Sequence, residues 1–190
     1  MSIILASASP RRKELLEMLG ISDLKIIPAV GEERAPEGLE PGALVELLSR
    51  NKAAEVAARA EADDVIVAAD TVVVFDHEVF GKPRSREHAA KMLSALSGNT
   101  HRVFTGVTVM RRGEVLSRHN VSFVTFREMT AREIDAYIAT GEPMDKAGAY
   151  GAQGKGALFV KKIDGDFFNV MGLPICLLGE MLTSLGVDIL

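Results

Sequence analysis

The chain has 190 residues, of which 47% are hydrophobic and 25% charged, and this is enough to bury the core of one large domain or two small lobes. Its net charge of −4 argues against a nucleic-acid-binding protein, because such proteins need a basic surface to neutralise phosphates. No apolar run reaches the roughly 18 residues of a membrane span, and the first residues show no signal-peptide pattern. The single cysteine, Cys176, cannot form an internal disulfide, so we expect a cytoplasmic protein in a reducing compartment.

The first half of the chain predicts strands that alternate with helices. Ser9 and Pro10 are a typical N-cap and first residue of a helix, which follows an apolar run and ends near Gly20. The β-branched run Val65–Phe75 is apolar at almost every position and predicts a central strand buried on both faces. Hydrophobic periodicity places the other elements of this half at residues 2–6 and 25–28, as strands, and at residues 42–60, as a helix.

The second half of the chain predicts two hairpins and three helices. Ser85 is a candidate helix cap, Thr130 and Glu133 have the spacing of a capping box, and Gly113 marks a hairpin turn. The predicted elements are helices at residues 85–96, 130–141 and 174–185, and hairpins of residues 103–110 with 115–126 and of residues 158–163 with 167–170. This order predicts an α/β fold with a mixed sheet flanked by helices, in a single domain of residues 1–190.

Asp70 lies within the predicted central strand. Burying a carboxylate costs several kcal/mol unless it is paired, hydrogen-bonded or bound to a metal ion. One interpretation is a structural aspartate at a strand bend that accepts backbone N–H groups. The other is a functional carboxylate that binds a metal ion, acts as a general base for water, or does both. Asp70 is therefore the first candidate for a catalytic residue.

Hydroxyl and guanidinium groups gather where the first predicted helix begins, at Ser7, Ser9, Arg11 and Arg12. A helix N-terminus presents free N–H groups and a positive dipole end. The guanidinium group of arginine can donate two hydrogen bonds at once to phosphate oxygens. Capping serines are common and the arginines could be solvated. However, two cations oppose the helix dipole at this end, and a bound anion would compensate them. The segment therefore predicts a phosphate site.

Two lysines are further candidates for phosphate contacts. Lys52 falls on the apolar face of the predicted helix at residues 42–60, together with Val45, Leu48 and Val56. Its side chain either extends along the edge of the core or points into a phosphate pocket. Lys82 lies in a Gly-Lys-Pro loop beyond the central strand and indicates little by itself.

Two adjacent glutamates, Glu32 and Glu33, lie on the loop after the second predicted strand. An acidic surface loop is the usual explanation for such a pair. The alternative is that one of them meets Asp70 at a Mg²⁺ ion, because Mg²⁺ is typically bound by one or two carboxylates together with substrate phosphates.

The segment at residues 142–156 is rich in glycine and contains Gln153. It consists either of flexible turns or of a loop that closes over a ligand while Gln153 reads the edge of a base. It is not a P-loop, because Ala149 stands where the first glycine is needed and Gly156 replaces the Ser or Thr. The histidines lack metal-ligand spacing and Cys176 has no obvious partner, so a nucleophilic Cys/His or Ser/His mechanism is poorly supported.

Taken together, these segments make the chain resemble the Maf family of nucleotide pyrophosphatases over nearly its whole length. No single segment is specific, but their combination in this order is. The matching segments are SASPRR at 7–12, NKA at 51–53, ADTV at 69–72, GKP at 81–83, SGNTH at 97–101, TGV at 105–107, GEP at 141–143 with the residues through 154, and NVMGLP at 169–174.

The resemblance implies an elongated α/β fold related to the inosine triphosphate pyrophosphatases, with two lobes, a central cleft and often a homodimer. It implies cleavage of a nucleoside triphosphate between the α and β phosphates with Mg²⁺ or Mn²⁺ as the metal cofactor. By position, Asp70 matches the catalytic carboxylate, and Asp70 and Glu33 match the metal ligands. The positions that match substrate-binding residues are Ser7, Arg11, Lys52 and Lys82. The family often has Asp-Glu where this chain has Glu32-Glu33, which leaves the role of Glu32 open.

Branches of the family differ at three specificity positions, which correspond to Arg12, Thr71 and Gln153. This combination resembles the branch that acts on dTTP and UTP rather than the branch that prefers 7-methyl-GTP. The amide of glutamine offers a donor and an acceptor, which suits O4 and N3–H of thymine or uracil. Two alternatives stay open at this point: a non-catalytic nucleotide-binding regulator of cell division, and a house-cleaning enzyme that removes modified pyrimidine nucleotides.

Overall fold

The computed structural model describes residues 1–21, 23–31 and 35–190. Contacts between residues divide the chain into two compact units, and several chain segments contribute to each unit. We call them unit 1 (Met1–Asp70, Thr105–Asn120 and Gly172–Leu190) and unit 2 (Thr71–Phe104 and Val121–Met171). No helix in the described part of the chain is both long enough and apolar enough to cross a membrane.

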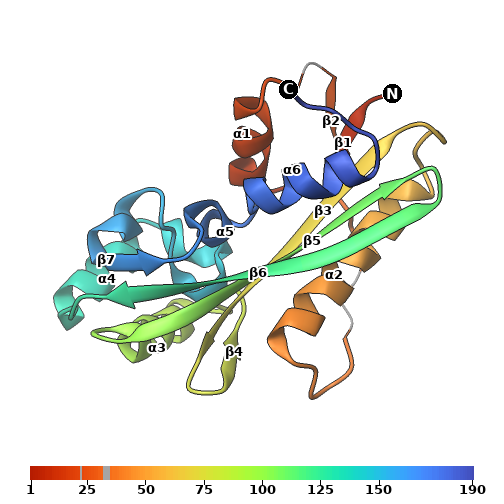
Figure 1. Cartoon of the computed structure of the whole chain (residues 1–190). Coiled ribbons are helices and arrows are strands. Elements are labelled where there is room, and N and C mark those ends of the chain that lie inside the picture. Colours follow the sequence, from red (N-terminus) through yellow and green to blue (C-terminus); the bar gives the residue numbers. More distant parts are fainter. Residues whose placement is uncertain (22, 32–34) are drawn as a thin grey trace. The chain divides into compact units, whose positions relative to one another are not determined.

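The described residues form a seven-stranded mixed sheet and six α-helices, whose arrangement Figure 1 shows. The strands are β1 (Ile3–Leu5), β2 (Leu24–Ile26), β3 (Val65–Phe75), β4 (Glu78–Phe80), β5 (Thr100–Arg111), β6 (Glu114–Phe126) and β7 (Val160–Asp164). The helices are α1 (Pro10–Met18), α2 (Pro41–Ala57), α3 (Arg86–Leu96), α4 (Ala131–Ala139), α5 (Phe167–Met171) and α6 (Ile175–Ser184), with short 3₁₀ turns η1 (Glu142–Asp145), η2 (Ala147–Ala149) and η3 (Lys155–Phe159).

The strand order is β2-β1-β3-β5-β6-β7, and β4 pairs with β3. Strand β1 is parallel to both β2 and β3, whereas β4 is antiparallel to β3 and β7 is antiparallel to β6. The predicted α/β class with a mixed sheet is therefore confirmed. The predicted turn after β5 is also confirmed, because Arg112 and Gly113 both have positive φ, as a two-residue hairpin turn requires.

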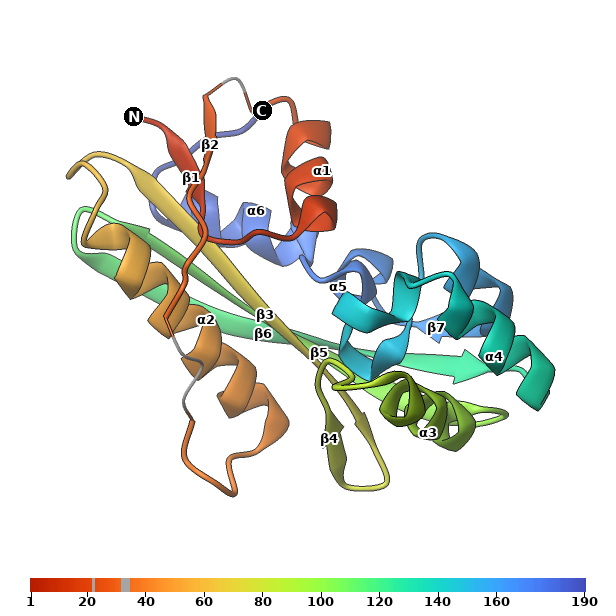
Figure 2. The same cartoon turned by 180° about the vertical axis from the view of Figure 1, so that it is seen from behind.

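In unit 1 the sheet is covered by helices on both faces. Figure 2 shows α2 in front of the sheet, whereas Figure 1 shows α6 in front of the sheet from the other side. Helix α2 buries Ala53 and Val56 in one cluster with Ile4, Ile66 and Ala68 of β1 and β3. Helix α6 buries Leu178, Met181 and Leu182, which lie at helical spacing. Both faces of β3 in this unit are buried, as its apolar sequence predicts.

Helix α2 approaches strand β5 very closely at Gly106. A Cβ built on Gly106 would lie 2.3 Å from the carbonyl carbon and oxygen of Val45, so no other residue fits there without moving the helix. A buried hydrogen bond of 2.9 Å between the hydroxyls of Ser49 and Thr108 joins the same two elements. The glycine and the hydroxyl pair together determine where α2 lies along β5.

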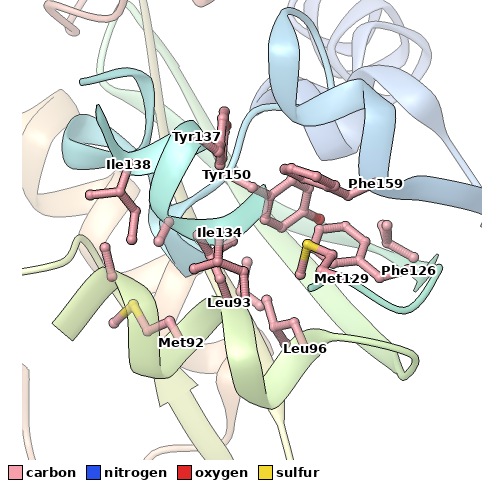
Figure 3. Close-up of a cluster of buried hydrophobic side chains, with 14 of the residues drawn as sticks. Met92, Leu93, Leu96, Phe126, Met129, Ile134, Tyr137, Ile138, Tyr150 and Phe159 are labelled. Carbon is pink, nitrogen blue, oxygen red and sulfur yellow. The ribbon is translucent and has the colours of Figure 1, made fainter. Parts of the chain in front are cut away.

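Unit 2 has its own core, which Figure 3 shows in detail. Helices α3 and α4 pack against each other, and their apolar faces meet Phe126, Tyr150 and Phe159 from the sheet and the 3₁₀ turns. Both predicted caps are confirmed: Ser85 Oγ accepts the N–H of His88, and Thr130 forms a full capping box with Glu133. The sequence signals for the beginnings of α3 and α4 were therefore correct.

The predicted hairpin of residues 158–163 with 167–170 is wrong in its second strand. Strand β7 pairs with β6 instead, and residues Phe167–Met171 form the one-turn helix α5. The cause is Asp166, whose Oδ1 accepts the N–H of Phe168 at 2.7 Å, and whose backbone is held by Ser122 Oγ from β6. An aspartate that accepts an N–H two residues later favours the start of a helical turn over an extended strand.

Candidate functional site

A mostly buried ion pair joins β3 to α2 in unit 1. Asp70 is 7% exposed, and Lys52 Nζ donates a hydrogen bond to its Oδ1 at 2.5 Å. When the side chains alone are considered, Lys52 is 19% exposed and Asp70 is 9% exposed. A buried carboxylate needs a compensating charge or hydrogen bond, and Lys52 supplies both. The strand aspartate and the helix lysine that stood out in the sequence are thus in direct contact.

The periodicity of α2 explains why Lys52 reaches this carboxylate. Val45, Leu48 and Val56 are buried on the face of the helix that packs against the sheet. Lys52 lies one turn after Leu48 and one turn before Val56, so its Cβ points in the same direction. The alkyl chain follows the edge of the core and the ammonium group ends at Asp70. The contact with Asp70 does not test the interpretation that Lys52 points into a phosphate pocket, which stays a prediction.

Arg12 ties three segments of unit 1 together with its guanidinium group. Its Nε donates to the carbonyl oxygen of Gly172 at 2.8 Å, and its Nη1 donates to that of Ala69 at 2.8 Å and to Ser7 Oγ at 3.2 Å. Ala69 directly precedes Asp70 in β3. The planar fork of arginine suits such a set of acceptors, which the ammonium of lysine would not match. Ser7 and Arg12 therefore lie where β3 reaches Asp70.

Helix α1 begins as the sequence predicts, with Ser9 at the N-cap and Pro10 at the first helical position. The Ser9 side chain makes no capping bond; instead Ser7 Oγ accepts the backbone N–H of Ser9 at 3.2 Å. The first turn contains no acidic residue, so Arg11 and Arg12 both oppose the helix dipole there. For Arg12, the carbonyl oxygens of Ala69 and Gly172 provide compensation from within the protein.

The other predicted site residues, Thr71, Lys82 and Gln153, belong to unit 2. Thr71 is half-buried on β3, whereas Lys82 and Gln153 are exposed on loops. The loop of Lys82 is joined to the glycine-rich segment because Gly148 N–H donates to the carbonyl oxygen of Gly81 at 3.1 Å. Within unit 2, this hydrogen bond therefore joins the loop of Lys82 to the segment that contains Gln153.

The backbone around Gln153 is anchored at both ends by two side chains. Glu142 Oε2 accepts the N–H of Lys155 at 3.0 Å, and Oε1 accepts the N–H of Gly156 at 3.1 Å. Tyr137 Oη donates to Glu142 Oε1 at 2.9 Å and accepts the N–H of Gly151 at 3.1 Å. Residues 151–156 are thus a loop with a defined conformation and not a run of flexible turns.

A buried histidine lies in the core of the same unit. His101 is 1% exposed, and its Nε2 lies 2.8 Å from Tyr150 Oη. Burial lowers the pKa of His101 to about 4, and burial followed by the charge of Tyr137 raises the pKa of Tyr150. His101 Nδ1 has no hydrogen-bond partner among the described residues. The pair is therefore neutral at pH 7 and supports the segment that follows Tyr150.

The predicted metal ligands are described only in part. Glu32 and Glu33 lie outside the described residues, so their predicted meeting with Asp70 stays a prediction. Among residues 1–21, 23–31 and 35–190, no group of three or more His, Cys, Asp or Glu side chains is arranged to hold a metal ion. Asp70 itself has a carboxylate, which is a hard oxygen donor of the kind that a metal ligand requires. One or two such carboxylates fit an ion that takes its other ligands from substrate phosphates and water.

Glu142, Tyr137 and His101 were not among the residues singled out from composition and spacing. Glu142 acts on the backbone N–H groups of residues 13 and 14 positions later in the chain, and such partners have no sequence signature. The acceptors of Arg12 are likewise backbone carbonyls, 57 and 160 positions away. The signal that could have identified Glu142 is its place at the beginning of the glycine-rich segment, where free N–H groups need acceptors.

Comparison with known proteins identifies relatives along the whole chain. A family model described as "Maf-like protein" matches residues 2–185. A protein of Moorella thermoacetica named dTTP/UTP pyrophosphatase is 50% identical over 98% of this chain and 96% of its own length. A protein of Agathobacter rectalis with the same name is 47% identical over 98% of each chain.

A more distant likeness is found among solved structures. A HAM1 protein from Coxiella burnetii aligns with a TM-score of 0.52 over 97% of this chain and 99% of its own, with 18% of residues identical. At that identity the likeness concerns the fold alone. The expected mixed α/β fold with helices flanking the sheet is therefore found in a second, solved protein.

Proposed function

The chain belongs to the Maf family, and from this premise we propose that it is an enzyme that hydrolyses a nucleoside triphosphate to the nucleoside monophosphate and pyrophosphate. Two relatives of 50% and 47% identity, each aligned over nearly its full length, are named dTTP/UTP pyrophosphatases and support this reaction. The observation that carries the proposal is the ion pair between Asp70 on the central strand and Lys52 on α2. Next to it, Arg12 donates to the carbonyl oxygen of Ala69, the residue before Asp70, and to Ser7 Oγ.

In this proposal Asp70 orients the attacking water or accepts its proton. The water oxygen forms a bond to phosphorus while the α–β phosphoanhydride bond breaks, and pyrophosphate leaves with the electron pair of the bridging oxygen. Ser7, Arg11, Lys52 and Lys82 bind the triphosphate and offset the negative charge that grows on the leaving group. Lysine is suited to this task because its compact charge follows a phosphate without a fixed geometry.

A divalent metal ion, Mg²⁺ or Mn²⁺, belongs to the same proposal. Asp70 and Glu33 would hold it, since carboxylate oxygens are the protein ligands that Mg²⁺ prefers next to phosphates. When bound, the ion neutralises phosphate charge and polarises the bond that is cleaved. The contact of Lys52 with Asp70 is consistent with this role, because it keeps the carboxylate fixed on β3 at the place where the phosphates are expected.

Arg12, Thr71 and Gln153 select the base in this proposal, with dTTP and UTP as the preferred substrates. The amide of Gln153 can donate to O4 and accept from N3–H of a pyrimidine. Modified pyrimidine nucleotides with the same edge would enter equally well, which fits a house-cleaning role. We further propose that the single domain of residues 1–190 works in the cytoplasm as a homodimer.

The experiment is a screen for pyrophosphate release from the common nucleoside triphosphates and 7-methyl-GTP, with Mg²⁺, Mn²⁺ or a chelator. Release from dTTP and UTP only in the presence of metal supports the reaction and the base preference. Strong release from 7-methyl-GTP would keep the reaction but contradict the preference. Tight nucleotide binding without any pyrophosphate would favour the alternative of a non-catalytic regulator.

A further inference from the structure

The loop that carries Gln153 is held by a hydrogen-bonded pair of side chains, Glu142 and Tyr137. We propose that this pair forms a clamp that sets the position of Gln153, so that Glu142 and Tyr137 are positioning residues for the choice of nucleobase. The inference rests on the proposed function, because it takes Gln153 to contact the base. It goes beyond that function by assigning a role to two residues that do not themselves reach the base.

The clamp holds the loop on both sides of Gln153. On the earlier side, Tyr137 Oη accepts the N–H of Gly151. On the later side, the two oxygens of Glu142 accept the N–H groups of Lys155 and Gly156. The hydrogen bond from Tyr137 to Glu142 closes the arrangement. The five residues from Gly151 to Lys155 therefore begin and end on one pair of side chains, with Gln153 in the middle and exposed.

The backbone within the loop lies close around the Glu142 carboxylate. Gly154 has φ of 109° and ψ of −153°, a conformation that residues with a side chain rarely adopt. A Cβ at this position would lie 3.0 Å from both oxygens of Glu142. The residue directly after Gln153 is therefore a glycine in close contact with the clamp, which holds the backbone next to Gln153 against Glu142.

The clamp residues are themselves held by further contacts. Tyr137 is 4% exposed on α4, and its ring lies edge-on to that of Phe159 at 5.2 Å between centroids (Figure 3). Lys146, which is 9% exposed, donates through Nζ to the carbonyl oxygen of Glu142 at 2.7 Å and to Asp145 Oδ1 at 2.6 Å. Rigid supports of this kind hold a recognition group in place at no further entropic cost when the ligand binds.

Electrostatics favour the charged form of Glu142 in the clamp. Burial raises the pKa of this carboxyl. The hydrogen bonds from Lys155, Gly156 and Tyr137 and the charge of Lys146 together lower the pKa by more than burial raises it, so it lies below its ordinary value. An ionised carboxylate accepts at both oxygens, and a glutamine amide would present a donor to one of the two N–H groups. Glu142→Gln therefore opens the clamp with almost no change of volume.

The test compares Glu142→Gln and Tyr137→Phe with wild type for kcat/KM on UTP, dTTP, CTP and GTP. We expect the preference for UTP and dTTP over CTP and GTP to fall about tenfold, because a displaced recognition group loses selectivity before it loses chemistry. Amide hydrogen exchange should speed up at Gly151, Lys155 and Gly156. Asp164→Asn is the matched control: it removes an exposed partner of Lys162 on β7 in the same unit and should keep the wild-type preference.

Gln153→Ala separates the clamp from the proposed function. If Gln153→Ala lowers the preference and Glu142→Gln adds nothing further in that background, the clamp acts through Gln153, as proposed. If Gln153→Ala lowers the preference while Glu142→Gln and Tyr137→Phe retain it, the clamp is overturned and the proposed function stands. If Gln153→Ala has no effect on the preference, or if wild type releases no pyrophosphate, the base-reading role or the reaction fails, and the clamp inference fails with it.

Discussion

Lys52 Nζ and Asp70 Oδ1 lie 2.5 Å apart and join a helix to the central strand of unit 1. Because both side chains are mostly buried, each stabilises the charge of the other in surroundings where water cannot do so. The two residues therefore form one electrostatic unit, although they lie 18 positions apart in the chain. A change to either partner should affect both the stability of the protein and the proposed reaction.

Asp70→Asn should lower the rate of pyrophosphate release by about two to four orders of magnitude, because the amide neither accepts a proton nor carries the charge that binds a metal ion. The variant keeps the shape of the side chain, so circular dichroism should show an unchanged fold. Asp63→Asn, which removes an exposed partner of Arg112 in the same unit, is the control and should retain wild-type rates. An active Asp70→Asn enzyme would refute the catalytic assignment.

Lys52→Met should destabilise the protein by on the order of 3 kcal/mol, because it leaves the buried Asp70 carboxylate without its lysine. Urea unfolding measures the loss. The control is Lys13→Met, which removes an exposed pair with Glu17 at 3.4 Å and should cost less than about 0.5 kcal/mol. Combining Lys52→Met with Asp70→Asn should restore much of the stability, and purely additive effects would contradict the coupling.

His101 should make the protein less stable as the pH falls below 6.5. Burial lowers its pKa from 6.5 to about 4 in the folded state, so between these values the unfolded chain binds more protons than the folded one. The stabilisation is complete above pH 6.5, declines as the pH falls and is lost near pH 4, with a total on the order of 3 kcal/mol.

Urea unfolding at several pH values between 4 and 8 tests this, with His101→Gln as the variant. Glutamine can still hydrogen-bond to Tyr150 but does not titrate, so the decline should become shallower. His77→Asn keeps His101 and should keep the decline. An identical pH dependence in His101→Gln and wild type would show that another group is responsible.

Asp166→Ala should cost about 1 kcal/mol, because Phe168 N–H at the beginning of α5 loses its acceptor. Asp166→Asn keeps an oxygen for this hydrogen bond and should recover most of the loss. Asp164→Ala, at the exposed end of β7, is the control for removing a carboxylate nearby. Equal stability of Asp166→Ala and wild type would mean that Ser122 alone holds the start of the helix.

Much of the fold could be predicted because its signals are local. The run Val65–Phe75 is a strand with those bounds, and Ser85, Thr130 and Gly113 stand at the caps and the turn that their residue types favour. Residues 167–170 were misassigned because so short a run, with three apolar residues around Asn169, fits a strand or a helical turn equally well. What decides between the two is Ser122, 44 positions earlier in the chain, which holds the backbone of Asp166.

The candidate site was predictable where a polar side chain interrupts an apolar pattern. Asp70 in a β-branched strand and Lys52 on an apolar helix face both stood out for that reason, and they are in contact. Arg12 was identified as a cation at a helix N-terminus, but its carbonyl acceptors at Ala69 and Gly172 could not be predicted. Every residue has such a carbonyl, so only the folded chain shows which ones converge.

The close packing of α2 on Gly106 has a consequence for any search for functional residues by random mutagenesis. A methyl group at Gly106 would collide with the backbone of Val45 at 2.3 Å, and two turns further along the same helix is Lys52. Because Lys52 lies about 10 Å from Val45 along the axis of α2, a tilt of this helix that relieves the collision would also displace Lys52. Such a screen would therefore report Gly106 among its inactive variants, although glycine has no functional group and the atoms nearest to an added Cβ here are backbone atoms of Val45 and Glu46. Its loss would be mistaken for the loss of a ligand contact unless Lys52 were examined as well.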